Sequence, residues 1–352
     1  MTARPGELLI VGFEGTRADE ALLERVATGR VGGVILFARN LGALGEVEAL
    51  VRSLGRAAQG SAGPSLIVSI DQEGGRVQRL KSPLTVWPPM ATLAAHGDEA
   101  LTEEVGRAIG DELRLFGINV DYTPVLDVRT NPANEVIGDR AFGTDAATVT
   151  RQALALWRGL EASGVRGCGK HFPGHGDTRA DSHLELPRID ASMERLRAVE
   201  LPPFAAAVRA GVGMIMTAHI VYAGIDERPA TMSAHWIDGV LRGELGYRGV
   251  VVSDDLDMKA VAGRFPVEEV VREALAAGVD AFLACRDPDI QQAAEAALER
   301  ASRDAVLGPR VEAAIGRLRA FRATLAPPVP VDAEARGRAL PNPQHRALAE
   351  RI

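Results

Sequence analysis

The sequence has few cysteines and no long apolar run. Its 352 residues include two cysteines, Cys168 and Cys285. Both lie inside apolar runs, so we interpret them as small core residues and not as a disulfide framework. The first apolar segment, residues 8–13, is too short for a signal peptide, and no later run is long enough to cross a membrane. We therefore expect a cytoplasmic protein without a membrane partner.

Positive charge is also scarce. Lysine and arginine number 40 against 47 aspartates and glutamates, which leaves a formal net charge of −7. No block of basic residues is present to neutralise phosphates, so a general nucleic-acid binder is not expected. Apolar residues make up 46% of the chain and charged residues 25%. This composition is typical of a globular protein that buries a large core.

Short apolar runs alternate with amphipathic helical patterns along the chain. The runs are nearly continuous in apolar residues, which favours a parallel sheet covered on both faces. Eight strand–helix units over roughly 300 residues predict a single α/β (β/α)8 TIM-type barrel. A doubly wound open sheet would show the same alternation and is the alternative. The predicted strands are residues 8–13, 33–37, 66–70, 119–122, 165–169, 213–217, 249–253 and 281–285.

A proline-rich segment, residues 326–330, separates the last helical pattern from the C-terminal residues. Proline clusters of this kind interrupt regular structure. We therefore predict one compact domain over residues 1–325. The remaining residues, 326–352, read as a polar tail with one short helix, and no second domain is expected.

Polar residues follow the predicted strands, where a barrel of this kind builds its active site. Carboxylates and cationic side chains together suit a polyhydroxylated substrate, because a carboxylate accepts from two neighbouring hydroxyls while lysine and arginine donate. Each residue also has a structural interpretation: Asp71 as a cap, Arg140 as an ion-pair partner of Asp139 or Glu135, His219 as a supporting residue, and one of Asp254 and Asp255 as structural because both cannot point into the same site. The strand-end residues are Asp71, Asp127, Arg140, Lys170, His171, His219, Asp254 and Asp255.

The densest group of ionisable residues lies between Lys170 and His183, on backbone broken by Pro173 and glycines. Loops positioned by a rigid scaffold commonly carry function. Residues 164–170 have P-loop spacing, but His171 stands where a serine or threonine should bind magnesium, so we reject that interpretation. A helical zinc pair of His171 and His175 fails because Pro173 breaks the helix. A metal site built from His171, His175, Asp177 and His183 remains an alternative.

Four segments resemble family-three glycoside hydrolases, and most of all the bacterial β-N-acetylglucosaminidases that act on peptidoglycan fragments. They are KHFPGHGDTRADSHLELP, DQEGGRVQRL, GDRAFG and VLRGELGYRGVVVSDDLDM. The resemblance extends from about residue 8 to residue 321.

The resemblance implies a retaining mechanism through a covalent glycosyl–enzyme intermediate. It implies Asp254 as the nucleophile and a histidine–aspartate dyad, His183 with Asp181, in place of the usual carboxylic acid/base. It also implies that Asp71, Arg140, Lys170 and His171 bind the sugar, with no metal and no cofactor. His175 and Asp177 form a competing His-x-Asp pair, and we interpret His175 as a residue that supports the loop.

The expected function is a retaining exo-β-N-acetylglucosaminidase of cell-wall recycling. We expect a monomer that takes a small carbohydrate, such as a muropeptide or another glycoside containing N-acetylglucosamine. A phosphorylase or β-glucosidase of the same family is the alternative. Two further hypotheses for the same polar residues are a metal-dependent hydrolase and a non-catalytic sugar-binding barrel.

Overall fold

Eight parallel strands form a closed barrel in the computed structural model, which describes residues 4–60, 63–179 and 186–352. Each strand pairs with the next one in the list, and the last pairs with the first, so the closed barrel is confirmed and the open sheet is wrong. All eight predicted strands are present. They are β1 (Leu9–Val11), β2 (Gly33–Leu36), β3 (Ile67–Ile70), β6 (Val120–Asp121), β7 (Arg166–Phe172), β9 (Met214–Thr217), β12 (Val250–Asp255) and β13 (Ala281–Ala284).

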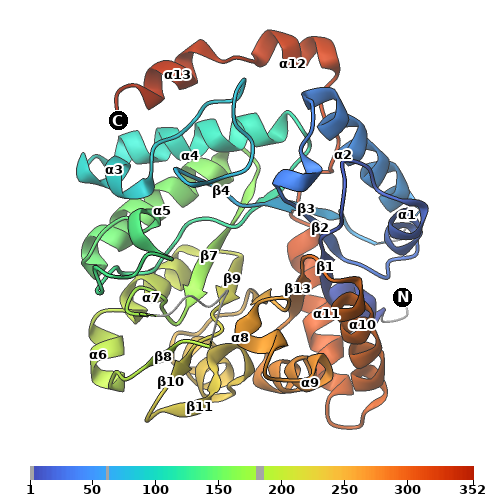
Figure 1. Cartoon of the computed structure of the whole chain (residues 1–352), viewed down its shortest axis with the longest axis vertical. Helices are drawn as coiled ribbons and strands as arrows, with labels where there is room; N and C mark the ends of the chain where they lie inside the picture. Colours follow the sequence, from blue (N-terminus) through green and yellow to red (C-terminus); the bar gives the residue numbers. More distant parts are fainter. Residues whose placement is uncertain (1–3, 61–62, 180–185) are drawn as a thin grey trace.

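Helices surround the barrel (Figure 1). Aspartate N-caps begin several of them, because a carboxylate can accept from backbone N–H groups that have no partner inside the helix. Asp19, Asp98 and Asp145 act in this way. The helices are α1 (Glu20–Ala27), α2 (Leu44–Gln59), α3 (Met90–Ala95), α4 (Glu99–Arg114), α5 (Ala146–Ala162), α6 (Met193–Ala198), α7 (Leu201–Ala210), a π-helix (His235–Glu244), α8 (Lys259–Ala262), α9 (Val267–Ala277), α10 (Pro288–Arg303) and α11 (Gly308–Arg322).

Two helices end as their sequences predict. Gly211 after α7 and Gly278 after α9 adopt the left-handed conformation, with φ of 86° and 109°. Glycine adopts such angles at low cost, and this conformation lets a helix end in a tight turn. Each glycine thereby directs the chain into the next barrel strand.

Short strands outside the barrel shape the loops on its catalytic face. β4 (Gln72–Gly74) and β5 (Val77–Gln78) form an antiparallel hairpin directly after β3. β8 (Arg188–Ile189), β10 (Val221–Tyr222) and β11 (Asp226–Pro229) form a small three-stranded sheet. These additions lie in the connections that follow β3, β7 and β9, where a barrel of this type carries its site.

An aromatic cluster supports the segment after β7. Phe172, the last residue of β7, packs edge-on against Phe204 with ring centroids 5.3 Å apart, and Trp236 lies 6.4 Å away. Tyr222 packs on Trp236, and its hydroxyl donates to the Gly174 carbonyl. All four rings are buried. The start of the histidine-rich segment is therefore anchored on the aromatic core.

The C-terminal tail forms two helices where one was expected, α12 (Ala333–Ala339) and α13 (Pro343–Ala349). The tail runs along the outer side of α4 (Figure 1). Leu340 and Leu348 are buried, and His345 Nδ1 lies 3.0 Å from Glu112 on α4. Two well-spaced leucines in a polar segment were too weak a signal to reveal this packing. Among the described residues, no helix is both long and apolar enough to span a membrane.

Candidate active site

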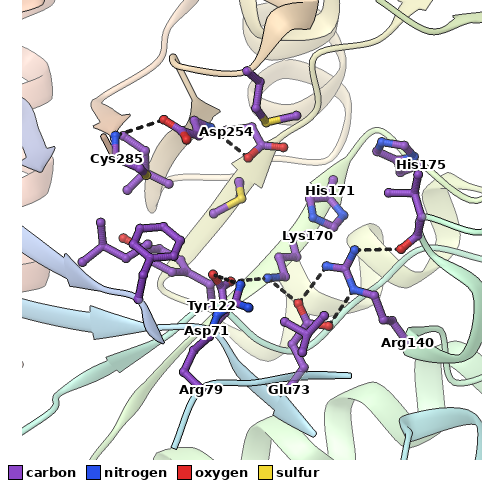
Figure 2. A pocket seen from close by; sticks show the side chains of 18 residues that line it. Asp71, Glu73, Arg79, Tyr122, Arg140, Lys170, His171, His175, Asp254 and Cys285 are labelled. Carbon is purple, nitrogen blue, oxygen red and sulfur yellow. Dashed lines mark hydrogen bonds and ion pairs between the residues drawn. The ribbon is translucent and has the colours of Figure 1, made fainter. Parts of the chain in front are cut away.

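A pocket of about 160 Å³ lies at the C-terminal ends of the barrel strands (Figure 2). Its ionisable acidic, basic and histidine side chains come from β7 and β12, from the segments after β3 and β7, and from the loop after β6. Apolar side chains line the remainder, among them Phe37, Met216 and Met258. The pocket includes all five site residues that were predicted on the described chain, namely Asp71, Arg140, Lys170, His171 and Asp254.

Glu73 lies between two buried cations. Its Oε1 lies 2.6 Å from Lys170 Nζ, and both carboxylate oxygens accept from the Arg140 guanidinium at 2.7 and 2.8 Å. The Glu73 side chain is 1% exposed and that of Lys170 is 3% exposed. Arg140 therefore forms two hydrogen bonds with Glu73, and its partner is neither Asp139 nor Glu135, the two carboxylates of its structural interpretation. Asp139 instead binds Arg76.

Burial and charge oppose each other in this group. Burial alone would raise the pKa of Glu73, but the positive charges of Arg140 and Lys170 outweigh it and hold the pKa well below its usual range. For Lys170, burial would lower the pKa, yet the carboxylates of Asp71 and Glu73 raise it above the usual value. Both residues consequently stay charged across the physiological pH range.

Asp71 is a pocket residue and not a helix cap. Its Oδ1 accepts from Lys170 at 2.8 Å, and its Oδ2 lies 3.4 Å from Arg79 NH2. Burial would raise the pKa of Asp71, but Lys170 and Arg79 together lower it. The residue thus remains a carboxylate whose oxygens lie at the pocket wall, where hydroxyl groups of a ligand can donate to them.

Asp127 holds two histidines in place. Its Oδ2 lies 2.7 Å from His171 Nδ1, and its Oδ1 accepts from the backbone N–H of His171 and of His175. Burial would raise the pKa of Asp127, but His171 and the hydrogen bonds lower it. Because the carboxylate accepts from Nδ1, that nitrogen carries a hydrogen, and His171 can present Nε2 to a ligand.

His175 lines the pocket as a supported, neutral residue. Its Nδ1 lies 3.0 Å from Thr178 Oγ1, and its carbonyl accepts from Asn134. Burial lowers the pKa of His175 to about 4. Asp177 does not pair with this ring in a histidine–aspartate dyad, because its carboxylate binds Thr130 and Arg195.

Asp254 and Asp255 both line the pocket, so the expectation that they could not share one site is wrong. Their roles still differ. Asp254 Oδ1 accepts from the backbone N–H of Asp255 at 2.8 Å. Asp255 Oδ1 accepts from the backbone N–H groups of Asp257 and Cys285, and burial followed by the charge of Asp257 raises the pKa of Asp255. Asp255 therefore ties the end of β12 to the end of β13.

The remaining predicted residues lie elsewhere. His219 is buried and supports the site, with Nδ1 2.9 Å from Thr231 Oγ1 and Nε2 3.2 Å from the Asp255 carbonyl. Asp181 and His183 lie outside the described residues. Within residues 4–60, 63–179 and 186–352, no group of three histidine, cysteine or acidic side chains could hold a metal ion.

Three contributors had no role assigned from the sequence. Glu73 and Arg79 lie inside the DQEGGRVQRL segment, and Asp127 follows the fourth predicted strand. Glu73 binds Arg140, which lies 67 residues further along the chain, and Asp127 binds His171, which lies 44 residues further along. Asp127 was a candidate because it follows a predicted strand. Only the folded structure shows which arginine, lysine or histidine each carboxylate binds.

A closed parallel barrel with a charged pocket at its strand ends is typical of an enzyme that acts on a small polar molecule. Comparison with known proteins gives the class more closely. Residues 2–320 match the model of the glycosyl hydrolase family 3 N-terminal domain. The chain belongs to this family and is a glycoside hydrolase.

Curated relatives and solved structures agree. A β-hexosaminidase of Chromobacterium violaceum is 40% identical over 88% of this chain and 86% of its own length, and one of Neisseria meningitidis is 39% identical over 81% and 80%. A family 3 β-N-acetylglucosaminidase structure from Paenibacillus has a TM-score of 0.93 at 39% identity, over the whole chain and 68% of its own. The structure of NagZ from Neisseria gonorrhoeae with N-trifluoroacetyl-D-glucosamine has a TM-score of 0.81 at 32% identity, over 97% and 96%.

Replacing the Glu73 carboxylate should leave the buried cations Lys170 and Arg140 without enough negative charge to compensate them. We expect Glu73→Gln to lower the free energy of unfolding by about 3 kcal/mol, because removing one partner of a buried ion pair leaves the other charge uncompensated. Activity should fall at least about a hundredfold because Lys170 and Arg140 move apart. Urea unfolding and steady-state kinetics measure both. As a control, Glu268→Gln removes an ion pair with Arg300 whose Glu268 side chain is 58% exposed, and should change stability by less than about 0.5 kcal/mol. Equal effects of the two variants would contradict the role given to Glu73.

The depressed pKa of His175, about 4, should make stability depend on pH. Between this value and the ordinary histidine pKa of about 6.5, the unfolded chain binds a proton that the folded chain does not. The free energy of unfolding therefore falls as pH falls through this window, and above it this histidine contributes no slope. Relative to His175→Gln, the wild type should lose roughly 2 kcal/mol between about pH 7 and about pH 5. If the free energy of unfolding changed with pH in the same way for the wild type and for His175→Gln, a buried, neutral His175 would be contradicted.

Proposed function

We propose that this glycoside hydrolase is a retaining exo-β-N-acetylglucosaminidase that removes terminal N-acetylglucosamine from peptidoglycan fragments during cell-wall recycling. Asp254 is the nucleophile, and His183 with Asp181 is the acid/base dyad. The observation that carries the proposal is the position of Asp254, a carboxylate at the end of β12 in the same pocket as Asp71, Lys170 and Arg140.

The nucleophile needs a carboxylate with a fixed direction next to the sugar. Asp254 meets this requirement because the backbone N–H of Asp255 donates to its Oδ1, and Asp255 is itself tied to the backbone of Asp257 and Cys285. One oxygen of Asp254 is thereby oriented by the strand end. In the proposed reaction, the carboxylate attacks the anomeric carbon while the glycosidic bond breaks and the leaving oxygen takes a proton from His183. Water, deprotonated by His183, then hydrolyses the glycosyl ester and restores the Asp254 carboxylate.

The sugar-binding groups supply acceptors and donors in one small volume. Asp71 accepts from hydroxyls, while Lys170 and Arg140 donate, and His171 offers Nε2 because Asp127 engages Nδ1. The opposing charges of this network compensate one another, which suits a neutral polyhydroxylated ring. Relatives described as β-hexosaminidases and a β-N-acetylglucosaminidase support N-acetylglucosamine as that ring.

The acid/base assignment rests on the family resemblance of the Asp-Ser-His tripeptide, residues 181–183. Two observations on the competing pair favour the same choice. A histidine with a pKa of about 4 is neutral near pH 7 and is a weak proton donor there, which argues against His175. Asp177 is engaged by Thr130 and Arg195, so it does not orient the His175 ring.

Removing the nucleophile tests the proposal directly. Purified protein should release nitrophenol from 4-nitrophenyl β-N-acetylglucosaminide, and Asp254→Ala should lower kcat by roughly 10³-fold or more. Asp304→Ala, an exposed aspartate between α10 and α11, is the control and should keep wild-type kinetics. Free sugar formed first as the β-anomer identifies a retaining hydrolase, whereas sugar 1-phosphate formed in phosphate buffer identifies a phosphorylase. Undiminished turnover by the Asp254 variant would overturn the assignment.

The proton-transfer residue is tested by chemical rescue. With His183→Gly, a substrate with a good leaving group should still form the glycosyl intermediate, and added azide should then restore turnover and yield the glycosyl azide. His175→Gly should show no such rescue, because its defect lies in the packing of the loop. Rescue of His175→Gly together with wild-type activity of His183→Gly would reverse the two roles.

A further inference from the structure

A second cleft, of about 370 Å³, lies on the same rim of the barrel. It is formed between the segment after β1 and the segment after β13, over the starts of α1 and α10. Phe13, Glu14 and Arg17 line it from one side and Arg286 and Gln291 from the other, with Arg25 between them. The proposed sugar-binding groups do not line it.

The cleft and the pocket share a wall. Phe37 and Cys285 line the pocket, while Phe13 and Arg286, the residue after Cys285, line the cleft. Arg39 joins the two parts of this wall, because its guanidinium lies 4.6 Å from the Phe37 ring centre and its Nε donates to the Phe13 carbonyl at 2.9 Å. A ligand that fills the pocket and continues along the rim on this side would therefore enter the cleft.

Positive charge exceeds negative charge in this region, although the whole chain carries a net charge of −7. Glu14 is 63% exposed and is shared by two arginines, at 3.2 Å from Arg39 and 3.6 Å from Arg286. Arg17 forms no ion pair with any residue that the structure describes. Arg25 Nε is buried and donates no hydrogen bond within the described part of the chain. The lining thus holds three arginines, Arg17, Arg25 and Arg286, against two carboxylates, Glu14 and Asp19, and Arg25 also pairs with Glu295 at 3.4 Å.

The position of Arg286 is set by the strand that carries Asp254. Asp257, three residues after Asp254, accepts from the backbone N–H groups of Cys285, Arg286 and Asp287 at 2.7 to 3.0 Å. These three bonds fix the start of the segment after β13 relative to the end of β12. The backbone of Arg286 is consequently tied to the segment that directly follows the proposed nucleophile.

We propose that this cleft binds a carboxylate-bearing part of the aglycone, the group released from N-acetylglucosamine. The inference rests on the proposed function and specifies its substrate class: anionic glycosides are preferred over neutral ones. Arginine recognises carboxylates through charge-assisted hydrogen bonds. In a peptidoglycan fragment the carboxylate can belong to the lactyl ether of the neighbouring sugar or to an attached peptide.

Three substrates distinguish these sources. They are neutral 4-nitrophenyl β-N-acetylglucosaminide, the disaccharide N-acetylglucosaminyl-β-1,4-N-acetylmuramic acid, and the same disaccharide with its lactyl group in amide linkage to an acidic peptide. In Arg17→Gln/Arg286→Gln, kcat/KM for at least one carboxylated substrate should fall about tenfold, mainly through KM. The value for the aryl substrate should change less than twofold. The substrate that loses most identifies the source of the carboxylate.

Two further variants make the test specific. Arg303→Gln is the matched control, because Arg303 and Arg286 are both 77% exposed and have ion-pair distances of 3.7 and 3.6 Å; all three substrates should be unaffected. Glu14→Gln releases Arg39 and Arg286 from their shared carboxylate, so kcat/KM for the carboxylated substrate should rise two- to threefold, roughly. A folding defect would not produce this gain.

The outcomes separate the two proposals. If the double arginine variant lost kcat/KM equally on neutral and carboxylated substrates, or lost none on either carboxylated substrate, the role of the cleft would be overturned. The proposed function would still stand, provided that the wild-type protein hydrolysed the aryl substrate. No release of nitrophenol by the wild-type protein would instead overturn the proposed function itself. Selective loss in the double arginine variant, with gain in Glu14→Gln, supports the cleft as the site of the anionic aglycone.

Discussion

The pocket depends on one buried carboxylate, that of Glu73. Lys170 and Arg140 both enter the same desolvated volume, and two unpaired cations there would repel each other and lose their hydration. Glu73 accepts from both, at 2.6 to 2.8 Å, and removes most of that cost. Because Glu73 belongs to the hairpin after β3, its ion pairs also join this hairpin to β7 and to the loop after β6. Glu73 thus sets the positions of the two cations that line the pocket, Lys170 and Arg140.

The chemistry of the rim follows from how charge is balanced in each part. In the pocket, the carboxylates of Asp71 and Glu73 compensate Lys170 and Arg140, which suits an uncharged ring with many hydroxyls. In the neighbouring cleft, three arginines face two carboxylates, Glu14 and Asp19, and the balance is positive. A neutral sugar ring would therefore be suited to the pocket, and an anionic part of the same substrate would be suited to the cleft beside it. Specificity on such a rim comes from the distribution of charge and not from its total.

Most of the fold could be predicted from the sequence, and so could the presence of Asp71, Arg140, Lys170, His171 and Asp254 at one pocket. Buried barrel strands are nearly uniform in apolar residues, so their eight runs stand out, and the residues after them must gather on one rim. The pairing of Glu73 with Arg140 could not be found, because it depends on side-chain directions in loops 67 residues apart. The tail also exceeded the prediction, since Leu340 and Leu348 pack two short helices against the barrel through tertiary contacts and not through a clear helical period.

His171 and His175 lie side by side in the pocket, and they differ in how Asp127 and their surroundings hold them. Asp127 accepts from the His171 ring and from the backbone of His175, so one carboxylate serves both residues. Burial, followed by the neighbouring His171, lowers the pKa of His175 to about 4. A neutral ring can pack in the pocket and hold the loop through Thr178, but it cannot supply a proton near neutral pH. This property of His175 favours the proposed assignment of the acid/base role to His183.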